Sequence, residues 1–126
     1  MINLKKIISK ESNEFIADYI THDEIKCKCN SDICTYTLID IRLINTWSKL
    51  RKEWGQPIQI NSCYRCQVHN ENVGGVKGSY HTYGTAIDLA LPLDHRDVSS
   101  FIRLCEKHFA FVKLYRNFVH TDIRSV

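Results

Sequence analysis

Two side chains suited to metal binding or acid–base chemistry lie close together near the C-terminus. In residues 118–124, the β-branched side chains of Val119, Thr121 and Ile123 alternate with a second set that is mostly charged or polar. This alternation predicts a strand. His120 and Asp122 would then share one face of that strand with Arg124. An imidazole beside a carboxylate can bind a metal ion, exchange protons, or form an ordinary structural hydrogen bond.

A second carboxylate of interest lies on an earlier predicted strand, at about 85–91. Asp88 would be flanked on its face by two alanine methyl groups, where a lone carboxylate is unfavourable unless it is paired or bound to a cation. Gly84 allows the chain to fold back so that His81 approaches Asp88. With His120, these residues predict a site of two imidazoles and one carboxylate, a ligand set that catalytic zinc uses. Each histidine taken alone is more often a structural residue with satisfied hydrogen bonds.

The elements that must position these residues can be read from the apolar periodicity. In chain order it predicts a helix at about 36–54, a strand at 57–62, a long loop at 63–84, a strand at 85–91, a helix at about 96–108 and strands at 111–115 and 118–123. The glycine-rich loop is expected to be too polar for the core. This order predicts an α+β domain, in which a small antiparallel sheet carries helices on one side.

The N-terminal part gives weaker signals. Residues 15–20 fit either a short strand or the end of a helix. Thr21 and Glu24 have the spacing of a capping box, which predicts a short helical turn. A cysteine-containing loop, 27–34, follows. We expect one domain over 1–126, with a cysteine-containing segment at 1–35 and a core at 36–126 that carries the metal site.

Composition and charge limit the class of protein. Apolar residues make up 44% and charged residues 25%, as in soluble globular proteins, and no apolar run reaches the ~20 residues of a membrane span. The net charge of +3 is too small to indicate nucleic acid, although it suits an anionic polymer such as a cell wall. The basic and apolar start is too short for a signal peptide. We therefore expect a monomer that is made in the cytoplasm and acts at the wall after release or export.

Longer motifs surround the candidate residues. One is Ser79-x-His81-x-x-Gly84-x-Ala86-x-Asp88, followed by Phe118-Val119-His120-Thr121-Asp122. Another is the run Ile60-Asn61-Ser62-Cys63-Tyr64-Arg65-Cys66-Gln67-Val68-His69-Asn70, followed by Val73-Gly74-Gly75-Val76. Together they resemble the zinc D-Ala-D-Ala carboxypeptidase and murein endopeptidase family, which belongs with the lysostaphin-type and hedgehog-fold metallopeptidases. The chain is short, as in the forms encoded by bacteriophages and prophages.

The resemblance implies a hedgehog/D-Ala-D-Ala carboxypeptidase-like fold and a specific activity. The protein would be a zinc peptidase that hydrolyses peptidoglycan stem peptides or cross-links, as a carboxypeptidase or an endopeptidase, and a phage lysis enzyme is one such form. One zinc ion per chain would be bound by His81, Asp88 and His120. The alternative is a non-catalytic zinc-binding or wall-binding module on the same fold.

The resemblance also implies roles for residues near the metal. Arg65 would contact the substrate, because a guanidinium can bind a peptide carboxylate or a developing oxyanion. Ser79 and Tyr64 would hydrogen-bond ligands or substrate, or only shape the loop. His69 and Asn70 are expected to tie the long loop to itself rather than to contact the metal.

The general base departs from the family pattern. Many members have an acidic residue three positions before the last histidine, or a second histidine two positions before it. This chain has Asn117 and Phe118 there, and neither accepts a proton. Asp122 is the nearest alternative, either as the base or as the residue that fixes the ring of His120. Both interpretations remain open at this point.

Six cysteines are many for a cytoplasmic chain of this length. Cys105 lies on the apolar face of the second predicted helix and is expected in the core. The other five are Cys27, Cys29, Cys34, Cys63 and Cys66. They allow reduced thiols, a disulfide formed after release, or a structural zinc site that uses four of them. We favour reduced or partly paired thiols.

Overall fold

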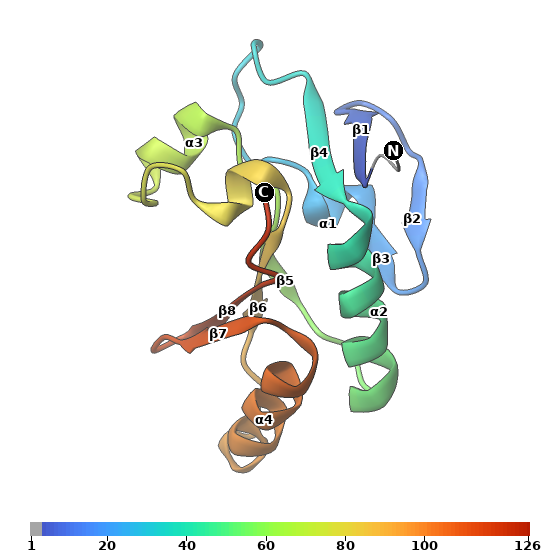
Figure 1. Ribbon diagram of the computed structural model, residues 1–126, viewed down its shortest axis with the longest axis vertical. Coiled ribbons are helices and arrows are strands. Elements are labelled where there is room, and N and C mark those ends of the chain that lie inside the picture. Colours follow the sequence, from blue (N-terminus) through green and yellow to red (C-terminus); the bar gives the residue numbers. More distant parts are fainter. Residues whose placement is uncertain (1–3) are drawn as a thin grey trace.

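A computed structural model of the protein describes residues 4–126 (Figure 1). The elements, in order, are β1 (Lys5–Ser9), β2 (Phe15–Ala17), β3 (Ile20–Thr21), α1 (His22–Ile25), β4 (Tyr36–Asp40), α2 (Ile41–Trp54), β5 (Ile60–Ser62), α3 (Gln67–Asn72), a 3₁₀ turn (Tyr80–Tyr83), β6 (Ala86–Ala90), a second 3₁₀ turn (His95–Asp97), α4 (Val98–His108), β7 (Phe111–Leu114) and β8 (Phe118–Asp122). The predicted α+β class with small antiparallel sheets is confirmed. No helix of the described residues is long and apolar enough to cross a membrane.

The central sheet is antiparallel with strand order β5-β6-β8-β7. Its register places Asp88 of β6 directly opposite His120 of β8. On the far side of β8, Lys113 of β7 is opposite His120. Because directly opposed residues in an antiparallel pair have neighbouring side chains, the backbone pairing itself brings an imidazole and a carboxylate together.

The two faces of this sheet differ in character. Ile87, Leu89 and Val119 alternate with the polar residues of β6 and β8 and are fully buried in the main core. Helices α2 and α4 cover that core, where the ring of Trp54 meets Phe101 edge to face at a centroid distance of 5.0 Å. Figure 1 shows α3 and α4 toward opposite ends of the molecule, with the sheet between them. Asp88, His120 and Asp122 therefore lie on the face of the sheet opposite the core.

The predicted helix at 36–54 is wrong in its first five residues, which form β4 and pair with β1. Residues 36–40 are rich in aromatic and β-branched types, which favour a strand once a partner is present. Helix α2 begins after Asp40, whose carboxylate accepts the backbone N–H of Arg42 at 2.8 Å as an N-cap.

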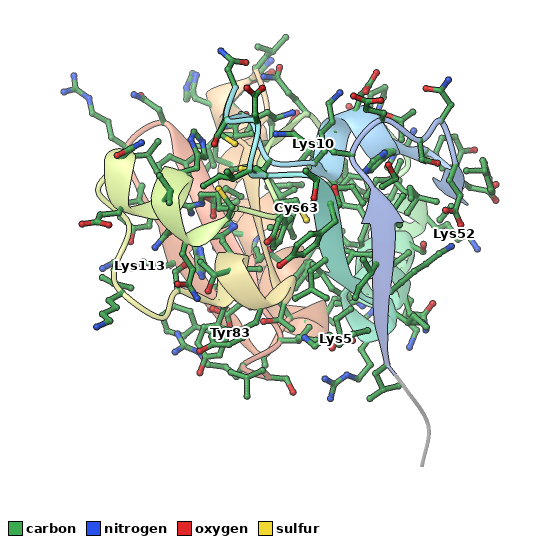
Figure 2. All side chains as sticks on the ribbon, turned by 90° about the horizontal axis from the view of Figure 1, so that it is seen from above. Lys5, Lys10, Lys52, Cys63, Tyr83 and Lys113 are labelled. Carbon is green, nitrogen blue, oxygen red and sulfur yellow. The ribbon has the colours of Figure 1, made fainter. Side chains whose placement is uncertain are left out.

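The segment predicted as a long polar loop is more ordered and more buried than expected. It contains α3 and the first 3₁₀ turn, and His81, Asn70 and Ser79 within it are buried. Cys63 is 1% exposed and lies in the interior of the molecule (Figure 2). It belongs to the main hydrophobic core, as does Ile60 of the preceding strand β5.

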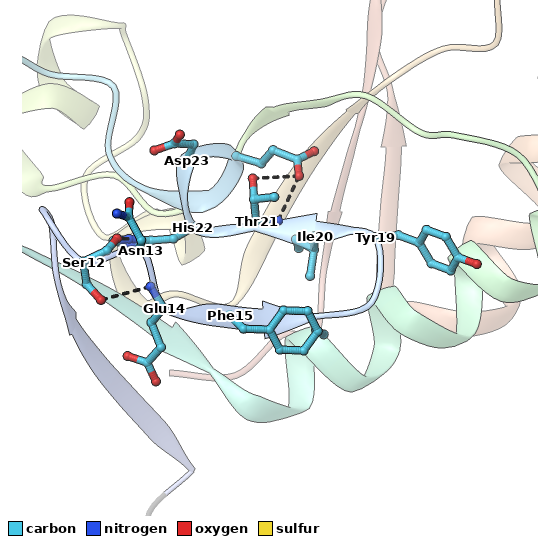
Figure 3. A pocket seen from close by; sticks show the side chains of 11 residues that line it. Ser12, Asn13, Glu14, Phe15, Tyr19, Ile20, Thr21, His22 and Asp23 are labelled. Carbon is cyan, nitrogen blue, oxygen red and sulfur yellow. Dashed lines mark hydrogen bonds between the residues drawn. The ribbon is translucent and has the colours of Figure 1, made fainter.

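The N-terminal signals resolve into a hairpin and a turn (Figure 3). The strand alternative for 15–20 is confirmed, since β2 and β3 pair there. Glu24 accepts hydrogen bonds from the backbone N–H and the hydroxyl of Thr21, at 2.9 and 3.0 Å, as the capping-box pattern predicts. Helix α1 is the single short turn that follows.

Candidate metal centre

Three side chains from separate segments meet on the polar face of the central sheet. The Oδ1 atom of Asp88 lies 3.1 Å from Nε2 of His81 and 2.9 Å from Nδ1 of His120. One potential ligand atom from each residue lies within 4.8 Å of the others. His81 and Asp88 are buried and His120 is half-buried, so the cluster lies just below the molecular surface.

His81 is held in a single orientation. Its backbone N–H donates to Oγ of Ser79, which caps the 3₁₀ turn, and Gly84 ends that turn with a positive φ of 71°. Its Nδ1 lies 2.6 Å from the carbonyl oxygen of Cys63. Because a carbonyl can only accept a hydrogen bond, Nδ1 carries the proton, and Nε2 of the neutral ring has a free lone pair toward Asp88.

His120 is held with the opposite tautomer. Its Nε2 lies 2.7 Å from Oδ2 of Asp122, which accepts a hydrogen bond from the protonated Nε2, and Nδ1 of the neutral ring then has a lone pair toward Asp88. The other oxygen of Asp122 accepts the backbone N–H of Arg124 at 2.9 Å and lies 3.2 Å from its Nε. Asp122 is 0% exposed, and these contacts engage both of its carboxylate oxygens.

The electrostatics of the cluster call for a positive charge at its centre. Two imidazole lone pairs and one carboxylate oxygen converge, which is repulsive unless a cation or a proton lies between them. Burial alone would raise the pKa of Asp88, but where a proton lies between the groups, the hydrogen bonds that His120 and His81 then donate lower this pKa to about 2. Burial opposes protonation of His120, but Asp88 and Asp122 raise its pKa overall. Two nitrogens and one carboxylate oxygen form a donor set that fits zinc.

Arg65 approaches the same carboxylate from the side. Its Nη2 lies 3.6 Å from Oδ2 of Asp88, and its backbone N–H donates to the carbonyl of His81 at 3.2 Å. The side chain is only 12% exposed, and its Nε is buried with no hydrogen-bond partner among the described residues. The guanidinium of Arg65 is therefore largely shielded from solvent.

A glycine-rich wall encloses Arg65. A Cβ on Gly75 would overlap the side-chain oxygen of Asn70 and lie 3.0 Å from Nη1 of Arg65. Asn70 ties this loop together as expected, because its Nδ2 donates to the carbonyl of Val76 at 2.9 Å and its backbone carbonyl accepts the N–H of Gly75. Only glycine leaves room for the side chain of Asn70, and for the guanidinium behind it, at this place.

The cluster lies in an open groove of about 480 Å³. The glycine-rich segment 73–79 lines one part of it and the β7–β8 hairpin another. Besides Arg65, the cationic side chains of Lys113 and Arg124 line the groove. Such a groove could hold a short peptide that carries carboxylates.

The structure brings together most of the predicted site residues. His81, Asp88, His120, Arg65, Ser79 and Asp122 all line the groove. Tyr64 does not line it, because its ring packs against Tyr36 at a centroid distance of 6.1 Å in a cluster with Cys27 and Cys34. Sequence reasoning did not single out Lys113 or the carbonyl of Cys63. The β7–β8 hairpin register could have indicated Lys113, whereas no sequence signal marks a backbone carbonyl.

A second hollow of similar size, about 460 Å³, lies beside the β2–β3 hairpin (Figure 3). It is lined by residues from 12 to 24, and several of their polar groups bond one another. Its lining does not contribute to either of the groups of potential metal ligands found among the described residues. The groove on the central sheet is therefore the candidate active site.

Comparison with known proteins agrees with this choice. A family model described as Peptidase M15 matches residues 18–122. The matched region includes every residue of the metal cluster as well as Arg65 and Asp122. A search of curated proteins finds no match.

Proposed function

The chain belongs to the peptidase M15 family, and we propose that it is a zinc-dependent peptidase that hydrolyses stem peptides or cross-links of peptidoglycan. The observation that carries the proposal is that Nε2 of His81 and Nδ1 of His120 lie 3.1 and 2.9 Å from the same carboxylate oxygen of Asp88, in the lining of a groove. Carboxypeptidase and endopeptidase action are both compatible with an open groove.

The zinc ligands would be Nε2 of His81, Nδ1 of His120 and the carboxylate of Asp88, with the groove side left for water and substrate. A zinc ion bound there supplies Lewis acidity, which polarises the scissile carbonyl and lowers the pKa of a water molecule. The Cys63 carbonyl and Asp122 hold the two rings so that their ligand nitrogens would face the ion. Metal-bound histidines are commonly oriented by such a hydrogen bond at the other ring nitrogen.

Arg65 would bind the substrate. Its guanidinium borders the groove beside Asp88, where it can bind a carboxylate of the peptide or the oxyanion that develops during attack. Stem peptides of D-amino-acid or diaminopimelate character carry such carboxylates. Lys113 and Arg124 add further positive charge along the groove.

Asp122 fits an orienting role better than that of a general base. One oxygen holds His120 and the other holds the backbone and side chain of Arg124. Because Asp122 is also 0% exposed, its carboxylate is directed at these partners and not at solvent. It contacts Nε2 of His120, whereas the proposed ligand atom of that ring is Nδ1.

A second candidate function is a non-catalytic zinc-binding or wall-binding module. The engagement of Asp122 favours it, together with Asn117 and Phe118 at the positions where many relatives have a proton acceptor. The side chain of Phe118 stacks on Tyr115 at a centroid distance of 4.7 Å. The wall of the groove is therefore aromatic there.

The test is digestion of intact peptidoglycan by the chelator-treated protein, with and without added zinc, followed by mass spectrometry of the fragments. We expect zinc-dependent release of peptides from the wild type and from His95→Ala, a control at an exposed histidine outside the groove. His120→Ala should release none. Wall binding without hydrolysis by the wild type would instead support the non-catalytic module.

A further inference from the structure

Four of the six cysteines converge at a place outside the groove. Cys27, Cys29 and Cys34 lie on the loop between α1 and β4, and Cys66 caps α3. All four sulfurs lie within 4.8 Å of one another. The loop and the start of α3 are far apart in the sequence, so the cluster ties the N-terminal part of the chain to the wall of the groove.

The sulfur spacing matches a metal site and not a disulfide. The Sγ of Cys66 lies 3.7 Å from that of Cys27 and 3.9 Å from that of Cys29. A disulfide requires about 2.05 Å. A tetrahedral zinc ion, with each sulfur ~2.3 Å away, places its sulfurs about 3.8 Å apart. All six cysteines lie within the described residues, and each is a free thiol.

The surroundings of the cluster suit thiolates. The backbone N–H of Cys66 donates to the sulfur of Cys27, and that of His69 donates to the sulfur of Cys66, each at 3.4 Å. Nζ of Lys10, labelled in Figure 2, lies 3.4 Å from the sulfur of Cys29. Such N–H donors and a nearby cation offset the negative charge that four thiolates leave around a divalent ion.

The cluster is largely enclosed but can be reached by an ion. Cys27 and Cys34 are buried, and Cys29 and Cys66 are half-buried. A hollow of about 430 Å³, lined by Lys10, Cys29 and Cys34 among others, leads to it from the surface. Four protein sulfurs complete a tetrahedron and leave no open position for substrate, which is typical of structural and not catalytic zinc.

We propose that Cys27, Cys29, Cys34 and Cys66 bind a second metal ion, a structural Zn²⁺, distinct from the ion at His81, Asp88 and His120. Zinc is favoured because soft thiolates in tetrahedral geometry select it. The proposal does not rest on the peptidase activity. It replaces the expectation of reduced or partly paired thiols for these four residues, and leaves Cys63 and Cys105 as buried thiols in the core.

An ion at this position would stabilise the segment that carries Arg65. Cys66 follows Arg65 directly, and the N–H of Tyr64 donates to the carbonyl of Ile25 at 2.9 Å. The ion would thus reinforce a contact between the N-terminal part and the segment that carries Arg65. It would fix the guanidinium beside Asp88.

The experiment is zinc analysis and zinc K-edge X-ray absorption on the wild-type protein, purified under reducing conditions. We expect two zinc ions per chain and, averaged over both, about two sulfur ligands per zinc at about 2.3 Å. One zinc per chain with no sulfur ligand would overturn this site and leave the groove site intact. One zinc with four sulfurs would support this site and contradict the ligand set of the proposed function. Iron in place of zinc would overturn the assignment of the metal.

Variants give an independent readout. Cys29→Ser and Cys34→Ser should each lose one zinc per chain and retain the zinc of the groove. Cys105→Ala, which removes a buried thiol outside the cluster, should retain two. Retention of two zinc ions by both serine variants would overturn the proposal. If these variants do not fold, the absorption measurement on the wild type still decides the question.

Discussion

The two ligand clusters of this molecule are built in different ways. The histidine–aspartate cluster rests on the register of β6 and β8, and each ring is fixed by a further hydrogen bond. The cysteine cluster draws three of its four members from the loop between α1 and β4. A strand register can hold a metal site in place without its ion, whereas we expect a loop that supplies most of the ligands to depend on the ion for its conformation.

Removal of both metals should give the largest effect and separate the clusters. We expect a chelator to abolish hydrolysis, with full recovery on addition of zinc. In hydrogen exchange, the backbone of 26–35 should lose protection in the metal-free protein, while β6 and β8 keep theirs because their ladder is intact. Loss of protection in β6 and β8 before the loop would contradict the comparison.

Arg65→Ala should reduce turnover by about 10²-fold, the scale of losing one donor to a developing oxyanion. Zinc content should stay at two ions per chain, because Arg65 is not a ligand of either cluster. Arg65→Lys is the matched control, and it should recover part of the activity since it keeps the charge without the fork. A large loss of stability with unchanged activity per folded molecule would assign Arg65 to the fold instead.

Asp122→Asn tests how strongly the group behind a ligand matters. If Asp122 orients His120, zinc affinity in the groove should fall by about 10–100-fold, and activity should recover in excess zinc. The cysteine site should be unaffected. Turnover that stays ~10²-fold low at saturating zinc would identify Asp122 as the general base.

Gly84→Ala should have the smallest effect on the sites and act through stability. A Cβ there would overlap the Leu38 carbonyl oxygen, and the positive φ adds about 1–2 kcal/mol. Gly55→Ala is the matched control, because its φ is also positive but nothing lies within 4 Å of its Cβ. In thermal melts, Gly84→Ala should be clearly less stable than Gly55→Ala. Equal melting temperatures would show that the close contact between this turn and β4 does not contribute to the stability of the fold.

The sequence was informative where local pattern decides structure. The alternation in β8 and the turn at Gly84 made His81, Asp88 and His120 candidates for one site, and the resemblance to the family assigned them as its ligands. The strand at 36–40 was not accessible in this way, because its partner β1 lies much earlier in the chain. The same apolar residues fit a helix when that partner is ignored.

The orientation of the rings and the membership of the cysteine cluster depend on tertiary contacts. The tautomer of His81 is set by the carbonyl of Cys63, and backbone groups leave no sequence signal. Spacing alone could not choose between Cys63 and Cys66 as partners of the loop. The structure separates them, since β5 carries Cys63 into the core while α3 presents Cys66 to the loop.

The most direct test of the groove site is an anomalous difference map at the zinc edge, from crystals of the zinc-loaded protein. We expect a peak at about 2.0–2.2 Å from Nε2 of His81, Nδ1 of His120 and a carboxylate oxygen of Asp88. This result would establish both the ligand set and the two opposite tautomers. An active, zinc-loaded protein without a peak between these three atoms would contradict the account.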